Sequence, residues 1–229
     1  MYINNKDITE YNAKLLNRII YPSETTINNE WNDNSLEPII DEKVKRKYKR
    51  VLIEIEFQGT PEEIEMNKSN LLKDISIATI KFKSLLNFYR GSMVNNDIKN
   101  KVNGFEVISI EMKVIEEEQE KTINFNKSND LTIFVGGNDT TPAIVEITPS
   151  IDVASVNITG FGEDITLNNL TIDNTVILDG VKGLITENGE NKFLDYDSWG
   201  FPRLEPGENN ISVDNDTLDI IIKYKPRWI

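Results

Sequence analysis

The sequence TPAIVEITPSIDVASVNITGFGEDITLNN, residues 141–169, decides the expected fold of the second half of the chain. β-Branched residues fill three short segments here, and Gly160 and the pair Asn168-Asn169 separate these segments as turn formers. Short segments at this spacing are typical of strands in a β-sandwich. The stretch therefore predicts short strands joined by tight turns.

The same pattern continues on both sides of this stretch. Asp179-Gly180 and Asn188-Gly189 supply the positive φ values that tight hairpins need. Strands are expected at residues 122–126, 131–137, 141–150, 154–160, 164–169, 175–180, 183–189, 209–214 and 218–225. Residues 121–229 are accordingly interpreted as one antiparallel β-sandwich domain.

The segment DYDSWGFPRLEPGENNISVDN, residues 195–215, is rich in turn formers and leads into the last strands. Pro202 and Pro206 cannot donate ladder hydrogen bonds, and Gly207 can adopt positive φ. We interpret it as a rigid connector, in which Trp199 and Phe201 are expected to pack against protein rather than against a sugar.

The first half mixes strands with one helix. Residues 51–57 alternate apolar and polar side chains, as a half-buried strand does. Thr60, Pro61 and Glu63 form a helix-start signature, which predicts a helix over 61–74. Two strands are expected within 76–94 and another over 105–115, whereas 13–42 and 95–104 are expected to be loops.

The run EEEQEK, residues 116–121, is interpreted as a solvated linker, because runs of like charge repel and stay hydrated. Residues 1–121 carry 18 basic and 21 acidic side chains, and residues 122–229 carry 7 and 17. This shift in composition places a domain boundary at about residue 120, between a domain of residues 1–120 and a domain of residues 121–229.

Composition excludes several classes of active site. The chain has 229 residues, no cysteine, no histidine and a net charge of −13. Thiolate nucleophiles, Ser-His-Asp triads and His-ligated zinc are therefore excluded. The acidic balance argues against binding of nucleic acid through phosphate contacts. The longest apolar stretches are far too short to span a membrane, so no membrane partner is expected.

No remaining motif indicates catalysis, a metal or a cofactor, and none of the three is expected. Asp195-Tyr196-Asp197 and Asp214-Asn215-Asp216 lack the spacing of an EF-hand, so turn chemistry explains them better. Carboxylate pairs for glycoside cleavage leave no mark in a single acidic sequence.

Two groups of residues are candidates for contact with a partner protein. The first lies in the basic run KVKRKYKR, where Lys43, Lys45, Arg46 and Lys47 suit an acidic neighbour better than nucleic acid. The second comprises Trp199 and Phe201, whose rings could cover a core edge, join a subunit contact or stack on a sugar.

Several motifs of the second half resemble the C-terminal half of phage distal tail proteins. These motifs are TPAIVEITP, ITGFGEDITL, VILDG, NGENKF, FPRLEPGENNI and YKPRW. The strand and helix of IEIEFQGTPEEI are similar to the N-terminal domain of the same proteins. The resemblance covers nearly the whole chain.

The resemblance implies a mainly β, non-enzymatic virion protein. Residues 1–120 would be an α+β belt domain with one helix, and residues 121–229 a galectin-like antiparallel sandwich. Six copies would form a ring at the tail tip, between the tail tube protein and the tail-tip or baseplate hub protein. DNA could pass through the lumen without specific binding, and the protein would be made in the host cytoplasm.

Two alternatives stay open at this point. One is a carbohydrate-binding module of a tail adhesion device that contacts the host cell wall, although a chain without histidine lacks the galectin type of sugar site. The other is a cell-wall hydrolase that uses carboxylates.

Overall fold

The structure is a computed structural model. It describes residues 1–26, 29–30, 36, 39–40, 45–126 and 128–229. For residues 26–46, Leu36 is the one residue whose side chain is described. The chain divides into two compact units, which are described separately. Unit 1 comprises Met1–Glu117 and Ile229, and unit 2 comprises Glu118–Trp228. Strands dominate both units, so the prediction of a mainly β fold is confirmed.

Unit 1 is built on one antiparallel sheet with the strand order β2-β1-β9-β10-β11-β8-β3. Its strands are β1 (Tyr2–Ile3), β2 (Lys6–Asp7), β3 (Ala13–Ile20), β8 (Lys49–Gln58), β9 (Ile77–Lys81), β10 (Phe88–Val102) and β11 (Phe105–Glu117). A short 3-10 helix, η1 (Ile8–Tyr11), joins β2 to β3.

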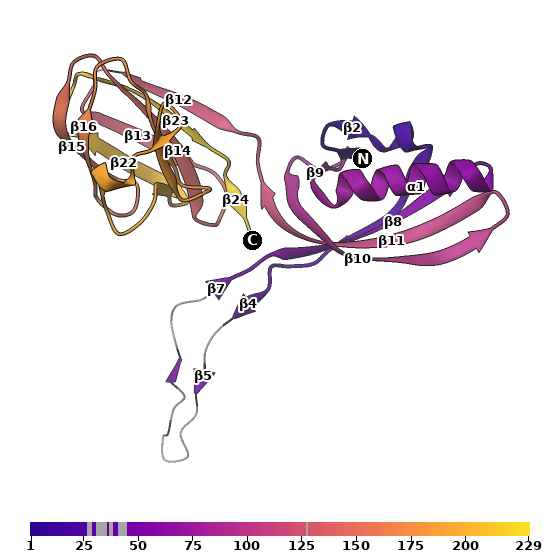
Figure 1. Cartoon of the computed structure of the whole chain (residues 1–229). Helices are drawn as coiled ribbons and strands as arrows, with labels where there is room; N and C mark the ends of the chain where they lie inside the picture. The colour runs from indigo at the N-terminus through magenta and orange to yellow at the C-terminus, as the bar shows by residue number, and fades with distance from the viewer. Residues whose placement is uncertain (27–28, 31–35, 37–38, 41–44, 127) are drawn as a thin grey trace. The chain divides into compact units, whose positions relative to one another are not determined.

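Helix α1 (Pro61–Ile75) packs on one face of this sheet, as Figure 1 shows. The predicted capping box is present: the Thr60 side chain accepts from the Glu63 amide, and the Glu63 carboxylate accepts from the Thr60 amide. Ile64, Leu71 and Ile75 of the helix are buried against alternate residues of β8 and β11. The helix predicted over 61–74 is therefore confirmed.

Two predicted loops of unit 1 are wrong. Residues 13–20 form β3, and residues 95–102 continue β10, with irregular register after Met93 and Ile98. Beyond β3, β4 (Thr25–Thr26) pairs with β7 (Lys45–Arg46), and β5 (Asn29–Glu30) pairs with β6 (Ile39–Ile40). Figure 1 labels β4, β5 and β7.

Unit 2 is a sandwich of two antiparallel sheets, ordered β12-β23-β14-β17-β18-β19 and β13-β22-β15-β16-β20, with β21 paired to the start of β14. The strands of the sandwich are β12 (Lys121–Asn126), β13 (Asp130–Val135), β14 (Thr141–Pro149), β15 (Val153–Thr159), β16 (Ile165–Leu170), β17 (Val176–Asp179), β18 (Leu184–Glu187), β19 (Glu190–Asn191), β20 (Tyr196–Asp197), β21 (Arg203–Leu204), β22 (Gly207–Val213) and β23 (Leu218–Tyr224). The short strand β24 (Arg227–Trp228) belongs to neither of these two sheets.

Alternation builds the core of unit 2. Every second residue of β14 and of β23 is buried, and these side chains join those of the facing sheet in one apolar cluster. The strands predicted in this half are all present, each within a few residues of its expected bounds. Asn188 (φ 52°) and Gly189 (φ 84°) form the predicted tight hairpin between β18 and β19.

Candidate assembly surfaces

The free sheet edges of unit 1 are its first candidate surface. β3 ends the sheet, and β9 pairs with β10 only from Phe88 to Ser92, so the rest of β10 has no described partner on that side. Exposed apolar side chains accompany both edges: Leu16 and Ile19 on β3, and Val94 and Ile98 on β10. Unpaired edges of this kind can pair with another chain.

The face of the sheet opposite α1 has a polar central row, and the rows beside it include the apolar side chains of Ile19, Leu52 and Val107. The paired residues Asn17, Glu54, Ser109 and Asp97 form one row across β3, β8, β11 and β10. A neighbouring row carries Glu111, which forms an ion pair with Arg50 at 3.3 Å. Carboxylates therefore occupy the middle of this face, and a phosphate backbone would not bind there through charge.

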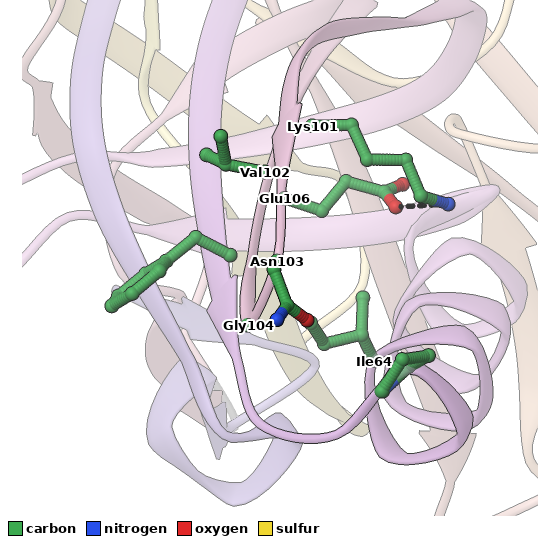
Figure 2. Close-up of a pocket in the computed structure, with 8 residues that line it drawn as sticks. Ile64, Lys101, Val102, Asn103, Gly104 and Glu106 are labelled. Carbon is green, nitrogen blue, oxygen red and sulfur yellow. Dashed lines mark ion pairs between the residues drawn. The ribbon is translucent and has the colours of Figure 1, made fainter.

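A small pocket lies where the turn between β10 and β11 meets the first turn of α1 (Figure 2). Its volume is about 230 Å³, and Pro61 and Ile64 of the helix line it together with residues 101–106. Lys101 and Glu106 meet along one wall (Figure 2). Buried Ile64 makes part of the pocket apolar, and Lys101 and Glu106 make another part charged.

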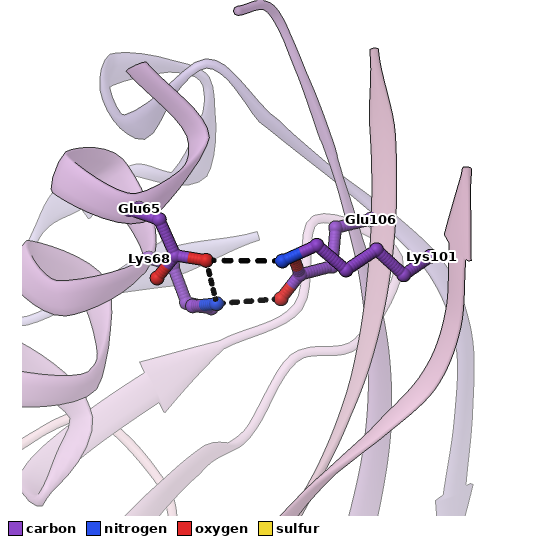
Figure 3. A network of polar contacts seen from close by, with 4 residues as sticks. All are labelled: Glu65, Lys68, Lys101 and Glu106. Carbon is purple, nitrogen blue, oxygen red and sulfur yellow. Dashed lines mark hydrogen bonds and ion pairs between the residues drawn. The ribbon is translucent and has the colours of Figure 1, made fainter. Parts of the chain in front are cut away.

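Glu106 is the centre of a polar network beside this pocket, which Figure 3 shows. Its carboxylate is 1% exposed and lies 2.6 Å from Lys68 Nζ and 2.9 Å from Lys101 Nζ. Glu65 contacts the same two ammonium groups at 2.9 and 3.2 Å. Burial alone raises the pKa of Glu106, but hydrogen bonds from Lys68 and Lys101 outweigh it and hold that pKa below its usual range. The network ties α1 to the β10–β11 hairpin.

A second group of ion pairs shows that the first two residues of the expected linker 116–121, Glu116 and Glu117, are not solvated. Glu116 accepts from the buried Lys49 ammonium and from the Asn87 amide, and Glu117 accepts two bonds from Arg90. Both glutamates end β11, and Glu117 is 3% exposed. Their charges are therefore neutralised inside unit 1 rather than by water.

The predicted contact residues of the basic run are only partly described. Lys43 lies outside the described residues, as do the side chains of Lys45 and Arg46, whose backbone forms β7. Lys47 is exposed, and its backbone amide donates to the Glu24 carbonyl. A role of this run in contacts stays a prediction.

Trp199 and Phe201 differ sharply in their surroundings. The Phe201 ring stacks on the ring of Tyr196, with centroids 6.0 Å apart, and packs against the core of unit 2. Trp199 is 100% exposed, so the expected packing against protein is not provided by its own chain. Gly207 has φ 95°, as the predicted connector requires.

Part of the chain matches a known protein family. Residues 136–228 match the family model described as the siphovirus-type tail component, C-terminal domain. The resemblance to phage distal tail proteins is confirmed. No protein in a search of curated sequences matches the chain.

Solved structures extend the likeness to the fold of the distal tail proteins over the whole chain. The crystal structure of SPP1 Dit (gp 19.1), described as a paradigm of the hub adsorption apparatus in phages that infect Gram-positive hosts, matches with a TM-score of 0.74 and 10% identity, covering 99% of this chain and 98% of that one. A chain of the phage P2 baseplate in its activated conformation with Ca matches with a TM-score of 0.55 and 12% identity, covering 95% of this chain and 92% of that one.

Among the described residues, no group of three or more acidic side chains is arranged to hold a metal ion. The helices described there include none that is long and apolar enough to cross a membrane.

Proposed function

We propose that this protein is a structural component of a phage tail tip, a distal tail protein that forms a ring between the tail tube and the baseplate. The match of residues 136–228 to the siphovirus-type tail component carries the proposal. The SPP1 Dit fold along nearly the whole chain supports it. Unit 1 would form the belt of the ring, and unit 2 would be the galectin-like outer domain.

The edges of unit 1 suggest how such a ring would close. A ring needs a heterologous contact, in which one surface of a subunit meets a different surface of the next. β3 of one copy and the free half of β10 in the next copy are two such surfaces, at opposite sides of one sheet. Their pairing would cover Leu16, Ile19, Val94 and Ile98. Six copies is the number that the resemblance implies.

The face of the sheet opposite α1, with its polar central row, suits the wall of a conduit. Glu54, Glu56, Glu111 and Asp97 lie on this face, and duplicated around a ring they would repel the phosphates of passing DNA. The proposed neighbours are the tail tube protein on one side and a tail-tip or baseplate hub protein on the other. The protein would be made in the host cytoplasm and carried in the virion, without an enzymatic step of its own.

Mass photometry of purified protein tests the ring contact. The wild type is expected to form a closed oligomer, and Ile19→Lys or Ile98→Lys is expected to leave monomers with an unchanged circular dichroism spectrum. Leu86→Lys is the matched control, because Leu86 is 91% exposed in unit 1 and lies on neither edge. A closed oligomer that survives both edge substitutions would rule out pairing of these edges.

A carbohydrate-binding module of a tail adhesion device is the second candidate. The fully exposed indole of Trp199 favours it, because aromatic faces stack on sugar rings. Binding of purified protein to cell-wall glycans that disappears with Trp199→Ala would support this candidate. If the wild-type protein binds no cell-wall glycan, this second candidate function is excluded.

A further inference from the structure

Three segments of unit 2 converge on one pair of stacked rings. Tyr196 lies between Phe193 and Phe201, with ring centroids 6.1 Å and 6.0 Å away. A Cβ on Gly183 would lie 3.3 Å from the Phe201 ring, so the turn between β17 and β18 reaches the same place. The 3-10 helix η2 (Phe193–Asp195), this turn and the loop after β20 therefore meet around Tyr196 and Phe201.

Around these rings, large apolar side chains are exposed to an unusual degree. We call them the apolar cluster, and its members are Val181, Leu184, Phe193, Leu194 and Trp199. Leu194 and Trp199 are as exposed as free side chains, at 101% and 100%. Single exposed apolar residues are ordinary, but several of them on segments that meet at one place indicate an interaction surface.

The segments that carry the apolar cluster are held rigidly. The Tyr196 hydroxyl donates to the Gly200 carbonyl, which fixes the loop that contains Trp199. Lys192 is 8% exposed and donates to the Asn169 carbonyl and to Glu187, and its ammonium lies 3.2 Å from Asp195. These bonds anchor η2 to β16 and β18. A preorganised surface loses little conformational entropy when it binds.

The charge that surrounds the apolar cluster is negative. Each basic side chain between residues 179 and 203 is already engaged: Lys182 with Asp179, Lys192 with Glu187 and Asp195, and Arg203 with Glu163. Glu190 and Asp197 are exposed, and no ion pair is formed with them by the described residues. A partner therefore meets apolar side chains bordered by uncompensated carboxylates.

We propose that the apolar cluster docks a different protein of the tail tip, one that presents an apolar recess with basic residues at its border. The inference rests on the proposed function, because it takes the partner from the same particle. Charge complementarity selects the partner. A second copy docked through the same cluster by two-fold symmetry would bring like carboxylates together.

Photo-crosslinking in assembled particles tests the docking surface. Benzoylphenylalanine replaces Trp199 in one phage and Phe134 in another; Phe134 is the matched control, 76% exposed on edge strand β13. After irradiation, mass spectrometry identifies the adducts. An adduct at 199 with another tail protein, on a peptide that contains Lys or Arg, is the expected result, and position 134 is expected to give none to that peptide.

Other outcomes overturn the inference. Adducts at 199 only with copies of this chain would replace the partner by self-association. No adduct in particles that contain the chain would exclude a docked protein, and glycan-array binding that depends on Trp199 would then assign the cluster to a carbohydrate. Particles that lack the chain altogether would contradict the proposed function itself and this inference with it.

Substitutions measure the same contact without a crosslinker. Leu194→Ser and Trp199→Ser change fully exposed side chains, so unit 2 is expected to keep its thermal transition. Each is expected to lower the amount of the crosslinked partner in particles by about tenfold, as loss of an interface anchor does. Glu190→Lys with Asp197→Lys is expected to act in the same direction through charge. Unchanged partner content in all three variants would overturn the proposal.

Discussion

Unit 1 and unit 2 bury their apolar side chains in different ways. In unit 1 a single sheet is covered by α1 on one face, and no described element of unit 1 covers the other face, whose central row is polar. In unit 2 two sheets cover each other, and the core is enclosed between them. The first arrangement leaves a free face and two free edges, whereas the second leaves loops and turns as its contact surface.

The two units also differ in the side chains that lie at the border of each apolar core. Buried ion pairs lie at both ends of β11 in unit 1, around Glu106 at its start and Glu116 at its finish. Among the residues of unit 2 that the structure describes, Lys192 is the one buried cation of this kind. The sheet of unit 1 therefore extends beyond the area that α1 covers. Where apolar side chains no longer cover the strand ends, ion pairs stabilise them.

The largest expected effects come from breaking each core separately. Phe57→Ala in unit 1 and Phe161→Ala in unit 2 both remove a side chain that is 1% exposed or less. Each is expected to lower the free energy of unfolding of its own unit by about 3–5 kcal/mol, through lost burial and a residual cavity. Differential scanning calorimetry should show one shifted transition in each variant. If either substitution shifted both transitions equally, the two cores would not be independent.

The second largest effect is expected in the polar network around Glu106, at the β10–β11 hairpin of unit 1. Glu106→Gln removes the negative charge between Lys68 and Lys101, and we expect the free energy of unfolding of unit 1 to fall by about 2 kcal/mol at pH 7. Urea titration followed by circular dichroism measures this change. Glu65→Gln is the control within the same network, and its effect should be much smaller because Glu65 is exposed.

The effect of Glu106→Gln should depend on pH. The pKa of Glu106 is lower in the folded protein than in the unfolded chain, where it is about 4.3. Its stabilisation is therefore complete above that value and is lost as the pH falls through the folded pKa. Wild type and variant should converge in acid. A gap that stays constant down to pH 2 would show that the charge of Glu106 contributes nothing.

A smaller effect is expected for Lys192, the buried cation of unit 2. Lys192→Met leaves Glu187 and Asp195 without their shared partner, and should cost about 1–2 kcal/mol in unit 2. Lys182→Met is the comparison variant, because Lys182 forms an ion pair with a single carboxylate, that of Asp179, and is exposed. Thermal unfolding should shift for the first variant and scarcely for the second. Equal shifts would mean that burial of Lys192 is unimportant.

The smallest effect concerns Tyr89, whose hydroxyl donates to Glu116 over 3.3 Å. Burial and the nearby carboxylate raise its pKa to about 12, whereas an unfolded tyrosine titrates near 10. Its contribution is complete below the unfolded value and is lost as the pH rises through the folded one. Tyr89→Phe should cost under about 1 kcal/mol at pH 7. The cost should shrink between pH 10 and 12, and spectrophotometric titration checks the shifted pKa.

Most of unit 2 was predictable because each strand has one buried and one exposed face. β14 and β23 alternate along their whole length, and turn formers mark their ends. Helix α1 was predictable from Thr60, Pro61 and Glu63, which act within one turn. These signals are local, and the structure confirms them.

The missed strands lack such a signal. The outer half of β10, residues 95–102, is exposed on both faces, so mostly polar residues fill it without alternation. In β3 an irregularity between Leu15 and Asn17 interrupts the period. Glu116 and Glu117 were read as solvated because their partners Lys49 and Arg90 are distant in sequence.

The apolar cluster shows the same limit for a candidate site. Trp199 could be selected by residue type, but Phe193, Leu194 and Leu184 become candidates only when their segments converge on Tyr196 and Phe201. Edge strands cannot be recognised from the sequence either, because an edge strand is one that has a neighbouring strand on one side only, and that depends on the tertiary fold. No local pattern carries this information.

Cryo-electron microscopy of intact particles tests the central claim most directly. The account predicts a closed ring of copies at the tail tip, with unit 1 around the channel and unit 2 on the outside. A tail tip resolved well enough to trace every chain, with no copy of this one, would contradict it.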